Sequence, residues 1–317
     1  MQFVRKHWFL LLLILMLISG VNFAERAAPL AELKWLSWSV VMITMFLMAW
    51  PLEFGSLQRT TTRPVAPLLA CVLNLVVIPL TIWPLVSLVG AELGGGMIVA
   101  AATPCTMASA AVWTRRAGGN DGVAILVTIL TNATCFIVMP FWIFVQTGSS
   151  IDSSLLTGTI YKLLLFVVLP IALAQSIRVD RRSAAWATGN KSFLSGLALI
   201  GILTMVFLGA VNMGLRLKLE DVKLGTATIL FAVALLALVH MAVFWSGIWL
   251  AGVIRLPRDE QIAVGFAGSQ KTLMIGLSVA INLGMSIIPI VAYHAIQLIV
   301  DTVFADRIRS RGDREDG

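Results

Sequence analysis

Charged residues are scarce in this chain. Asp, Glu, Lys and Arg make up 12% of its 317 residues, whereas hydrophobic residues make up 59%. Soluble globular domains carry about a quarter charged residues, so this composition argues against one. Uncharged, mainly apolar runs of about 20 residues recur along the chain, and a helix of that length crosses a bilayer. With a mean hydropathy of +0.93, the sequence predicts an all-α membrane protein surrounded by membrane lipid.

Several chemistries are missing as well. The three cysteines, Cys71, Cys105 and Cys135, lie in apolar segments and show no CxxC spacing, which argues against a disulfide framework or a cysteine metal cluster. The net charge is +7, but the basic residues are scattered through short loops, so we expect no nucleic-acid partner. No carboxylate pair, Ser/Lys arrangement or His-rich metal spacing lies at one depth of the apolar segments. We therefore expect neither an enzyme nor a bound cofactor.

The first apolar stretch has the outline of a secretory signal peptide, because Arg5, Lys6 and His7 precede it and it ends near Ala24. Asn22 departs from the small-residue pattern of a cleavage site. We interpret the stretch as an uncleaved first helix, because the segment count requires it.

Charged or Gly/Pro-rich breaks divide the chain into ten apolar segments. They are residues 8–24, 35–55, 65–90, 95–114, 122–146, 155–177, 192–214, 225–252, 261–282 and 286–304. Five spans per half turn the second half upside down, which predicts two inverted five-helix repeats. Three polar or helix-breaking positions coincide at one offset of 166 residues: Asn74 with His240, Pro104 with Gln270, and Thr128 with His294.

Lysines and arginines between the segments predict the orientation. With the N-terminus inside, sixteen are cytoplasmic: Arg5, Lys6, Arg59, Arg63, Arg115, Arg116, Arg178, Arg181, Arg182, Lys191, Arg255, Arg258, Arg307, Arg309, Arg311 and Arg314. Five lie outside: Arg26, Lys34, Arg216, Lys218 and Lys223. We therefore expect a multi-pass protein of the cell (inner) membrane with both termini in the cytoplasm.

Lys271 lies in the middle of the ninth segment. A charge at the bilayer centre costs roughly 2.5 to 3.5 kcal/mol on insertion scales, so such a residue marks a functional site or a structural lysine paired with a helix-end carbonyl. Small and polar residues surround it where apolar ones belong: Gly268, Ser269, Gln270 and Thr272.

The fourth segment has a matching interruption in the stretch from Ala102 to Ser109. Pro104 lies in this stretch and lacks the N–H that a helical hydrogen bond needs. Interrupted helices at matching positions of two halves indicate a transporter binding site near the midplane. Half-helix N-termini and Lys271 favour an anion, while carbonyl and hydroxyl oxygens can hold a cation. The site candidates at the two breaks are Thr106, Ser109, Ser269, Gln270, Lys271 and Thr272.

His240 and His294 are intramembrane histidines, each of which could be a proton carrier, a substrate contact or a hydrogen-bonded core residue. We expect Asp301 to be an interfacial carboxylate with a cytoplasmic partner. Lys162 is expected to reach the outer face or line a cavity.

Three motifs resemble the bile acid:sodium symporter superfamily, and within it the SBF-like orphan branch: residues 104–120, residues 268–273, and Tyr293-His294 with Gln297. The resemblance spans all ten segments. It implies a core domain (helices 3–5 and 8–10), a panel domain (helices 1, 2, 6 and 7) and a crossing of the broken helices 4 and 9. The corresponding boundaries are panel helices in 1–60 and 151–216, core helices in 61–150 and 217–306, and a basic cytoplasmic tail in 307–317.

In sodium-coupled members of the superfamily, two sodium ions bind at the crossing and an organic anion binds between core and panel. The resemblance therefore makes Asn74, Ser109, Thr128 and Gln270 candidate sodium ligands. Phe266, however, replaces a glutamate of those members, Ala110 replaces an asparagine, and Lys271 replaces a neutral asparagine. A fixed ammonium nearby repels sodium by several kcal/mol at an intermediate dielectric. We expect Lys271 to replace an ion or to titrate.

These observations predict a secondary-active transporter of a small organic anion that works by alternating access. Sodium or a proton is the candidate coupling ion, and a homodimer is the candidate assembly. Two alternatives stay open. Cys105 at the helix-4 break suits efflux of a metalloid or anion, and the lost glutamate suits a regulatory membrane protein that does not transport.

Overall fold

The computed structural model describes the backbone of residues 2–52, 64–148, 153–219 and 225–315. Within these ranges every regular element is a helix. Some predictions concern residues outside the described ranges: Arg59, Arg63, Lys223 and the domain boundaries near residues 60 and 150. The side chains of five further charged residues are also not described: Arg5, Lys6, Lys34, Arg311 and Arg314.

The first half of the described chain forms α1 (Gln2–Asn22), α2 (Ala24–Glu32), α3 (Lys34–Ala49), α5 (Val65–Val72), η2 (Leu73–Val77), α6 (Ile78–Ile82), η3 (Trp83–Leu88), α7 (Gly90–Ala102), α8 (Ser109–Arg116) and α9 (Asp121–Thr147). The second half forms α10 (Ser153–Leu163), η5 (Leu164–Val168), α11 (Leu169–Arg178), α12 (Arg181–Gly189), α13 (Lys191–Leu219), α14 (Thr226–Val253), α15 (Arg258–Ser269), α16 (Leu273–Leu283) and α17 (Ile288–Glu315). Elements η2 and η5 are π-helical turns inside longer helices. Helix α17 continues through most of the predicted tail.

Seven helical stretches of the described chain are long and apolar enough to cross a membrane: Val65–Leu88, Asp121–Thr147, Ser154–Arg178, Lys191–Lys218, Thr226–Val253, Arg258–Leu283 and Ile288–Ser310. Leu11–Asn22 and Ala24–Glu32 pass the same test as a pair bent by 99°, and Trp35–Ala49 and Gly90–Ala102 are shorter apolar helices. The prediction of an all-α integral membrane protein is confirmed. The count of ten spans and the inverted repeat stay predictions.

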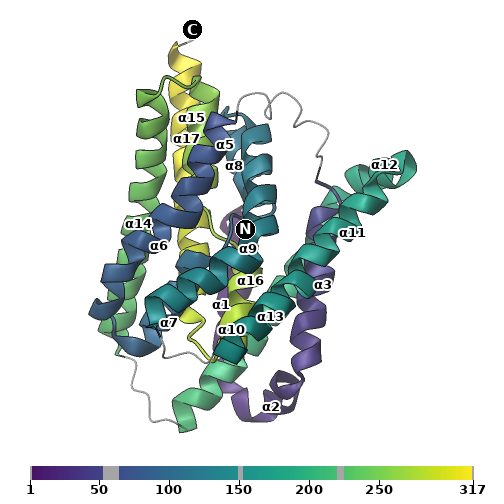
Figure 1. Ribbon diagram of the computed structural model, residues 1–317, viewed down its shortest axis with the longest axis vertical. Helices are drawn as coiled ribbons and strands as arrows, with labels where there is room; N and C mark the ends of the chain where they lie inside the picture. The colour runs from purple at the N-terminus through teal and green to yellow at the C-terminus, as the bar shows by residue number, and fades with distance from the viewer. Residues whose placement is uncertain (1, 53–63, 149–152, 220–224, 316–317) are drawn as a thin grey trace.

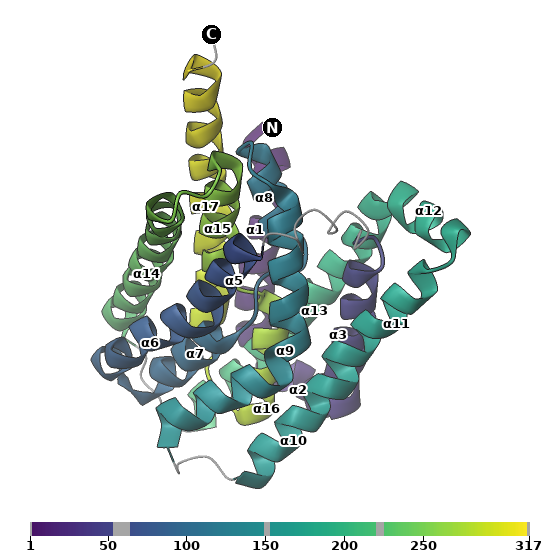
Figure 2. The ribbon, with the colours of Figure 1, turned by 45° about the horizontal axis from the view of Figure 1, so that its top comes forward.

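The helices pack in two groups. Helices α1, α2, α3, α11 and α13 contact one another, while α5, α9, α14, α15 and α17 form the second set of contacts. Figures 1 and 2 show α3, α11 and α12 on one side and α14, α15 and α17 on the other. Contacts of α9 with α10 and of α13 with α16 join the groups. The assignment of the helices to a panel and a core domain stays a prediction, as does separate movement of the two.

Helix α1 is held against α13 by small residues. A Cβ atom added at Gly20 would lie 2.5 Å from the Cβ atom of Ala210, so only glycine permits this approach. Such close backbone packing is a common way for membrane helices to associate. The first apolar segment is therefore an integral part of its helix group.

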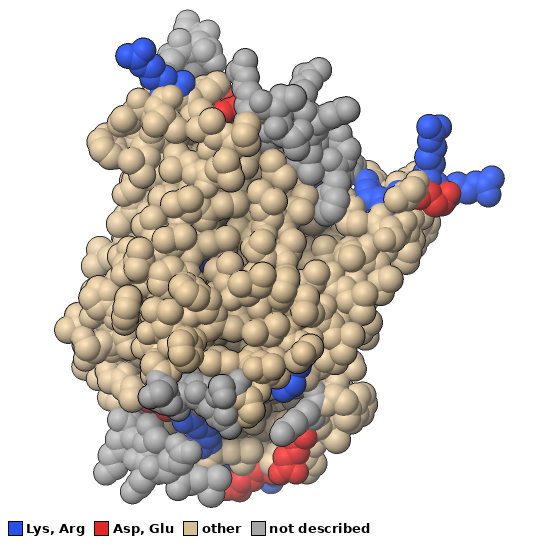
Figure 3. All heavy atoms as spheres, in the orientation of Figure 1, with Lys and Arg blue, Asp and Glu red and all other residues tan. Residues whose placement is uncertain are grey.

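Charged side chains gather toward the two ends of the molecule. Figure 3 shows them above and below a broad uncharged band on the face in view. At one end Arg116 pairs with Asp306 at 2.7 Å; at the other, Arg216 pairs with Glu92 at 2.9 Å. This distribution suits a protein whose middle band lies in lipid.

Candidate functional site

The structure places a helix break at both predicted positions, and the two breaks touch. Helix α7 ends at Ala102 and α8 begins at Ser109, while α15 ends at Ser269 and α16 begins at Leu273. The backbone is extended at Thr103 (ψ 149°) and at Gln270 (ψ 142°). The amide of Thr272 donates to the carbonyl oxygen of Pro104 at 2.9 Å. Backbone groups freed from both helices therefore meet at one place inside the protein.

A third set of free backbone groups comes from the span that contains Asn74. In the π-helical turn η2 the amide of Ile78 bonds to Leu73 O, so Asn74 O would need the amide of residue 79. Residue 79 is proline and has no N–H. Pro79 also denies Leu75 O its α-helical partner, and Trp142 Nε1 bonds that oxygen at 2.6 Å instead. Pro79 thereby turns Asn74 O into a free acceptor.

Lys271 takes up these free acceptors. Its Nζ lies 2.6 Å from Asn74 O, 3.2 Å from Asn74 Oδ1 and 2.7 Å from Thr103 O. The residue is 2% exposed. An ammonium has three donors and no acceptor, so three oxygen atoms match the charged form. Lys271 thus links its own break to the α7–α8 break and to η2.

Gln270 joins the same breaks through its side chain. Its Oε1 accepts hydrogen bonds from the hydroxyls of Thr106 and Ser109, each at 2.8 Å, and its Nε2 donates to Asp301 Oδ2 at 2.6 Å. Its backbone oxygen accepts from Asn74 Nδ2 at 2.8 Å. The predicted residues Asn74, Thr106, Ser109, Gln270 and Lys271 therefore form one connected network.

The arrangement does not fit a sodium ion. Both oxygens of Asn74 face the Lys271 ammonium, and Gln270 Oε1 accepts from two hydroxyls. A further cation would have to enter beside a fixed positive charge, which repels it.

Helix α9 supports the α7–α8 break with one polar face. Thr131 Oγ1 accepts from the amide of Cys105 at 3.1 Å, and Asn132 Nδ2 donates to Cys105 O at 2.9 Å. Cys105 itself is fully buried, with its Sγ 3.8 Å from the hydroxyl of Thr128. The thiol therefore packs against α9.

The position of Asp301 differs from the prediction. We expected an interfacial carboxylate with a cytoplasmic partner, but Asp301 is 0% exposed and lies 2.9 Å from His240 Nε2. Its second oxygen accepts from Gln270. A buried carboxylate is stable only when it is paired or hydrogen-bonded, and these two neighbours meet that requirement. Helix α17 thus brings a carboxyl group to the crossing.

The remaining candidates act largely through backbone contacts. Gln297 Oε1 accepts from the amide of Lys271 at 2.8 Å, and its Nε2 lies 3.0 Å from Lys271 O and 2.8 Å from His294 Nδ1. The hydroxyl of Ser269 donates within its own helix to Gly265 O at 2.8 Å. Thr272 contributes its backbone amide, which donates to the carbonyl oxygen of Pro104. His294 is buried, and its Nδ1 contacts Gln297.

Two of the three expected departures from sodium-coupled members, Phe266 and Ala110, are fully buried. Phe266 packs against Phe244 with ring centroids 4.8 Å apart, and Phe244 in turn contacts Phe304. Ala110 is buried at the start of α8. No carboxylate occupies the position of Phe266, so the buried acid of this crossing is Asp301 from α17.

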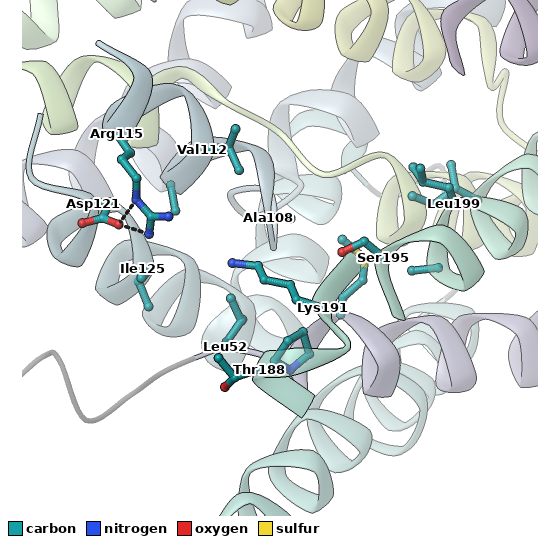
Figure 4. A pocket seen from close by; sticks show the side chains of 15 residues that line it. Leu52, Ala108, Val112, Arg115, Asp121, Ile125, Thr188, Lys191, Ser195 and Leu199 are labelled. Atoms are coloured by element: carbon teal, nitrogen blue, oxygen red, sulfur yellow. Dashed lines mark hydrogen bonds and ion pairs between the residues drawn. The ribbon is translucent and has the colours of Figure 1, made fainter. Parts of the chain in front are cut away.

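A cavity of about 520 Å³ opens beside the crossing, between the two helix groups. Its walls come from α3, α8, α9, α12 and α13. Figure 4 shows the ammonium of Lys191 projecting into it, with Ser195 nearby and Arg115 paired with Asp121. No ion pair of Lys191 occurs among the described residues. The cavity lies at the end that the charge distribution predicts to be cytoplasmic.

None of the predicted site residues lines this cavity, although Ala108 and Ala111 beside Ser109 do. Four residues that build the site lie outside the predicted site residues: Asp301, which was expected at the interface, and Thr131, Asn132 and Pro79. The sequence spacing indicates a shared helix face for two sets: Gln297 lies three residues after His294 and four before Asp301, and Thr131 and Asn132 lie three and four residues after Thr128. Such spacing places each set on one helix face.

Comparisons with known proteins agree with the motifs. The chain is 22% identical over 332 residues to "Sodium/bile acid cotransporter 7" of Danio rerio, with 97% of this chain and 95% of the relative covered. It is 25% identical over 255 residues to "Probable sodium/metabolite cotransporter BASS4, chloroplastic" of Arabidopsis thaliana; this match covers 72% of the chain and 55% of that relative. Residues 7–310 match the SBF-like CPA transporter family. The prediction from the motifs is confirmed, and the chain belongs to the SBF-like CPA transporter family.

Proposed function

We propose that the chain is a secondary-active transporter of a small organic anion in which Lys271 permanently occupies a cation position. One observation carries the proposal: the Lys271 ammonium is bound by Asn74 O, Asn74 Oδ1 and Thr103 O where the two helix breaks meet. In the sodium-coupled relatives that the resemblance describes, a free ion holds this region together. Here a tethered cation has the same role and does not dissociate.

The cavity supports an anionic substrate. Most of its lining residues are apolar, and they are joined by the cations Lys191 and Arg115 and the hydroxyls of Thr188 and Ser195. Organic-ligand sites commonly combine apolar walls with a few charged or polar groups. Asp121 neutralises Arg115, which leaves Lys191 as the cation that meets the anion. The chain would bind its substrate from the cytoplasmic side in this conformation, with both termini on that side.

Lys271 acts on the substrate indirectly in this proposal. Its three donors are matched by three acceptors, so none is left for a ligand. Its positive charge instead raises the potential of the crossing, which lies between two half-helix N-termini and favours an anion in the adjacent cavity.

Uptake of radiolabelled organic anions, including a bile acid, into proteoliposomes tests the function. We expect the wild type to accumulate at least one anion equally well with sodium and with choline as the external cation. Lys271→Met should reduce uptake at least about tenfold, because three buried oxygens lose their donor. Lys218→Met is the matched control, since Lys218 pairs with Glu25 at the exposed outer end.

Uptake that disappears when choline replaces sodium would contradict the tethered-cation proposal. Wild-type uptake by Lys271→Met would contradict it as well. If no anion is accumulated by the wild type or by Lys218→Met, the transport function itself fails.

A further inference from the structure

His240 and Asp301 form a buried pair beside the crossing. Both side chains are 0% exposed, and His240 Nε2 lies 2.9 Å from Asp301 Oδ1. His240 Nδ1 lies 3.3 Å from the carbonyl oxygen of Ser269, which can only accept a hydrogen bond. Each ring nitrogen therefore faces an oxygen atom that accepts a proton. The geometry suits a ring that carries protons on both nitrogens.

Removing one of these protons changes a single contact. With both nitrogens protonated, the ring donates to Asp301 and to Ser269 O. With only Nε2 protonated, it still donates to Asp301, but Nδ1 turns a lone pair toward Ser269 O. That contact then changes from attractive to repulsive, although Ser269 O keeps the hydrogen bond from the Tyr293 hydroxyl at 2.8 Å.

The affected carbonyl belongs to the helix break. Ser269 is the last residue of α15, and the next two residues are Gln270 and Lys271. On its other side, the pair contacts Gln270 directly, because Asp301 Oδ2 accepts from Gln270 Nε2 at 2.6 Å. A change in the proton content of the pair therefore acts on the break through both the backbone and the side chain.

A chain of hydrogen bonds connects the pair with the cavity. Gln270 Oε1 accepts from the hydroxyl of Ser109 at 2.8 Å, and Ser109 is partly exposed. Ala108 and Ala111, on either side of Ser109 and Ala110, line the cavity. An anion in the cavity and a proton on His240 would therefore bias the same two helix breaks, which is the requirement for coupling between two sites.

Few other titratable groups surround the ring. Helix α14 holds none besides His240, and Val65–Ile82, which α14 also contacts, holds only Cys71. From α17 the ring meets Tyr293 and Asp301, whereas His294 contacts Gln297. After α15 comes Lys271, whose ammonium is bound by Asn74 and Thr103. Asp301 is therefore the acid that faces the ring.

We propose that the His240–Asp301 pair binds the proton that drives transport, with one proton moved for each anion. The inference follows from the poor fit of sodium and rests on the transport function proposed above, which it extends by naming the coupling ion. The proton adds to Nδ1 from water on one side of the membrane and leaves to water on the other. No other bond forms or breaks.

Nuclear magnetic resonance tests the proton site without any substrate. The chain has three histidines, His7, His240 and His294, so ¹⁵N-histidine labelling of the full chain in lipid nanodiscs gives few signals. His7→Gln and His294→Gln assign the His240 ring. We expect this ring to change from singly to doubly protonated as the pH falls from about 9 to about 5. In Asp301→Asn the response of the ring to pH should differ from that of the wild type, whereas the His294 signals should not change.

A His240 ring that keeps one protonation state over this range would overturn the proton site. The same titration in wild type and Asp301→Asn would also overturn it, because the carboxylate would then have no role. The wild-type titration decides the first point even if Asp301→Asn does not fold.

Proteoliposomes with a trapped pH-sensitive dye test the coupling, using the same radiolabelled anions. An acidic exterior should raise accumulation of a monovalent anion about tenfold per imposed pH unit, because a tenfold concentration ratio and one pH unit represent the same free energy. The dye should record proton entry with the anion. His240→Gln should lose this response but retain exchange of labelled for unlabelled anion across the membrane.

The outcomes separate the two proposals. Anion accumulation that ignores the pH gradient overturns proton coupling and leaves the transport function standing. Loss of both accumulation and exchange in His240→Gln assigns the residue a structural role and likewise overturns the coupling. If no anion is accumulated at all, the coupling fails together with the transport function, while the resonance titration still decides whether the pair binds a proton.

Discussion

At the scale of single residues, Lys271 and Asp301 form the charge balance of the crossing. Gln270 lies between them, since it is the neighbour of Lys271 and donates to Asp301. The resemblance implies an acid on the broken ninth helix of sodium-coupled relatives, whereas the acid at this crossing comes from α17; in the proposed function, Lys271 supplies a covalently attached cation. The two buried charges stay hydrogen-bonded in this arrangement, which avoids the cost of an isolated charge in a membrane.

Replacing Lys271 by the residue of sodium-coupled relatives should open a cation site. In Lys271→Asn the ammonium is gone, and Asn74 O, Asn74 Oδ1 and Thr103 O become free to bind an ion. We expect about 100 mM sodium chloride to raise the melting temperature of Lys271→Asn relative to choline chloride, and to leave the wild type unchanged. Equal melting temperatures of the variant in both salts would contradict this reading of the oxygen cage.

The single thiol at the α7–α8 break should be dispensable. Cys105 is fully buried against Thr128, and no group of three or more His, Cys, Asp or Glu residues that could hold a metal occurs among the described residues. We expect Cys105→Ala to transport the accepted anion at close to the wild-type rate, with Cys135→Ala as the control for removing a buried thiol. Loss of transport in Cys105→Ala alone would instead support the metalloid alternative.

At the scale of elements, helix irregularities create the site. The π-helical turn η2 and Pro79 free the carbonyl of Asn74, and the extended residues 103 and 270 free those of the two broken helices. π-Helical turns often occur at functional sites, because they release a backbone group that a regular helix would use. A more regular helix would satisfy its own backbone and leave Lys271 without partners.

Pro79→Ala should therefore impair function although alanine favours helix. The new amide would compete with Lys271 Nζ or Trp142 Nε1 for the carbonyls of Asn74 and Leu75, and we expect uptake to fall at least about fivefold. Pro67→Ala is the matched control, because Pro67 lies in the first turn of α5, where an amide has no helical partner. Similar losses in both variants would show that the effect is not specific to η2.

At the scale of the whole molecule, the cavity lies at one end and polar contacts close the other. Lys162 of α10 bonds to Asn282 of α16 and lies over the ring of Trp38, and Arg216 of α13 pairs with Glu92 at 2.9 Å. These contacts join the two helix groups opposite the cavity. Alternating access would require them to break when the cavity closes.

Weakening the outer contacts should shift the population away from this conformation. We expect Lys162→Met to lower the reactivity of a cysteine placed in the cavity by Ser195→Cys toward a water-soluble maleimide, because the cavity closes more often. Lys218→Met, which removes an outer cation that contacts Glu25 within the α2–α13 pair, should leave the labelling rate unchanged. A faster or unchanged rate in Lys162→Met would argue against an outer gate.

The class of fold, the family and the two helix breaks could be predicted from the amino-acid sequence. Long apolar runs predict membrane helices, because a helix satisfies its own backbone hydrogen bonds inside a bilayer. Pro104 lacks a backbone N–H and Lys271 carries a costly charge, so each marks an interruption of an apolar helix. These signals are local, so they can be read without knowing which helices are neighbours. For the same reason the sequence marked Asn74, Gln270 and Lys271 as unusual.

The partners of these residues could not be predicted, because they depend on how the helices pack. Asp301 lies 31 positions after Gln270 and 61 after His240, and its sequence neighbours, which include arginines, suggested the wrong environment. Packing of α17 against α14 and α15 turns this carboxylate inward, where His240 and Gln270 satisfy it. Partnership between distant residues depends on helix packing, which hydropathy and local spacing do not encode.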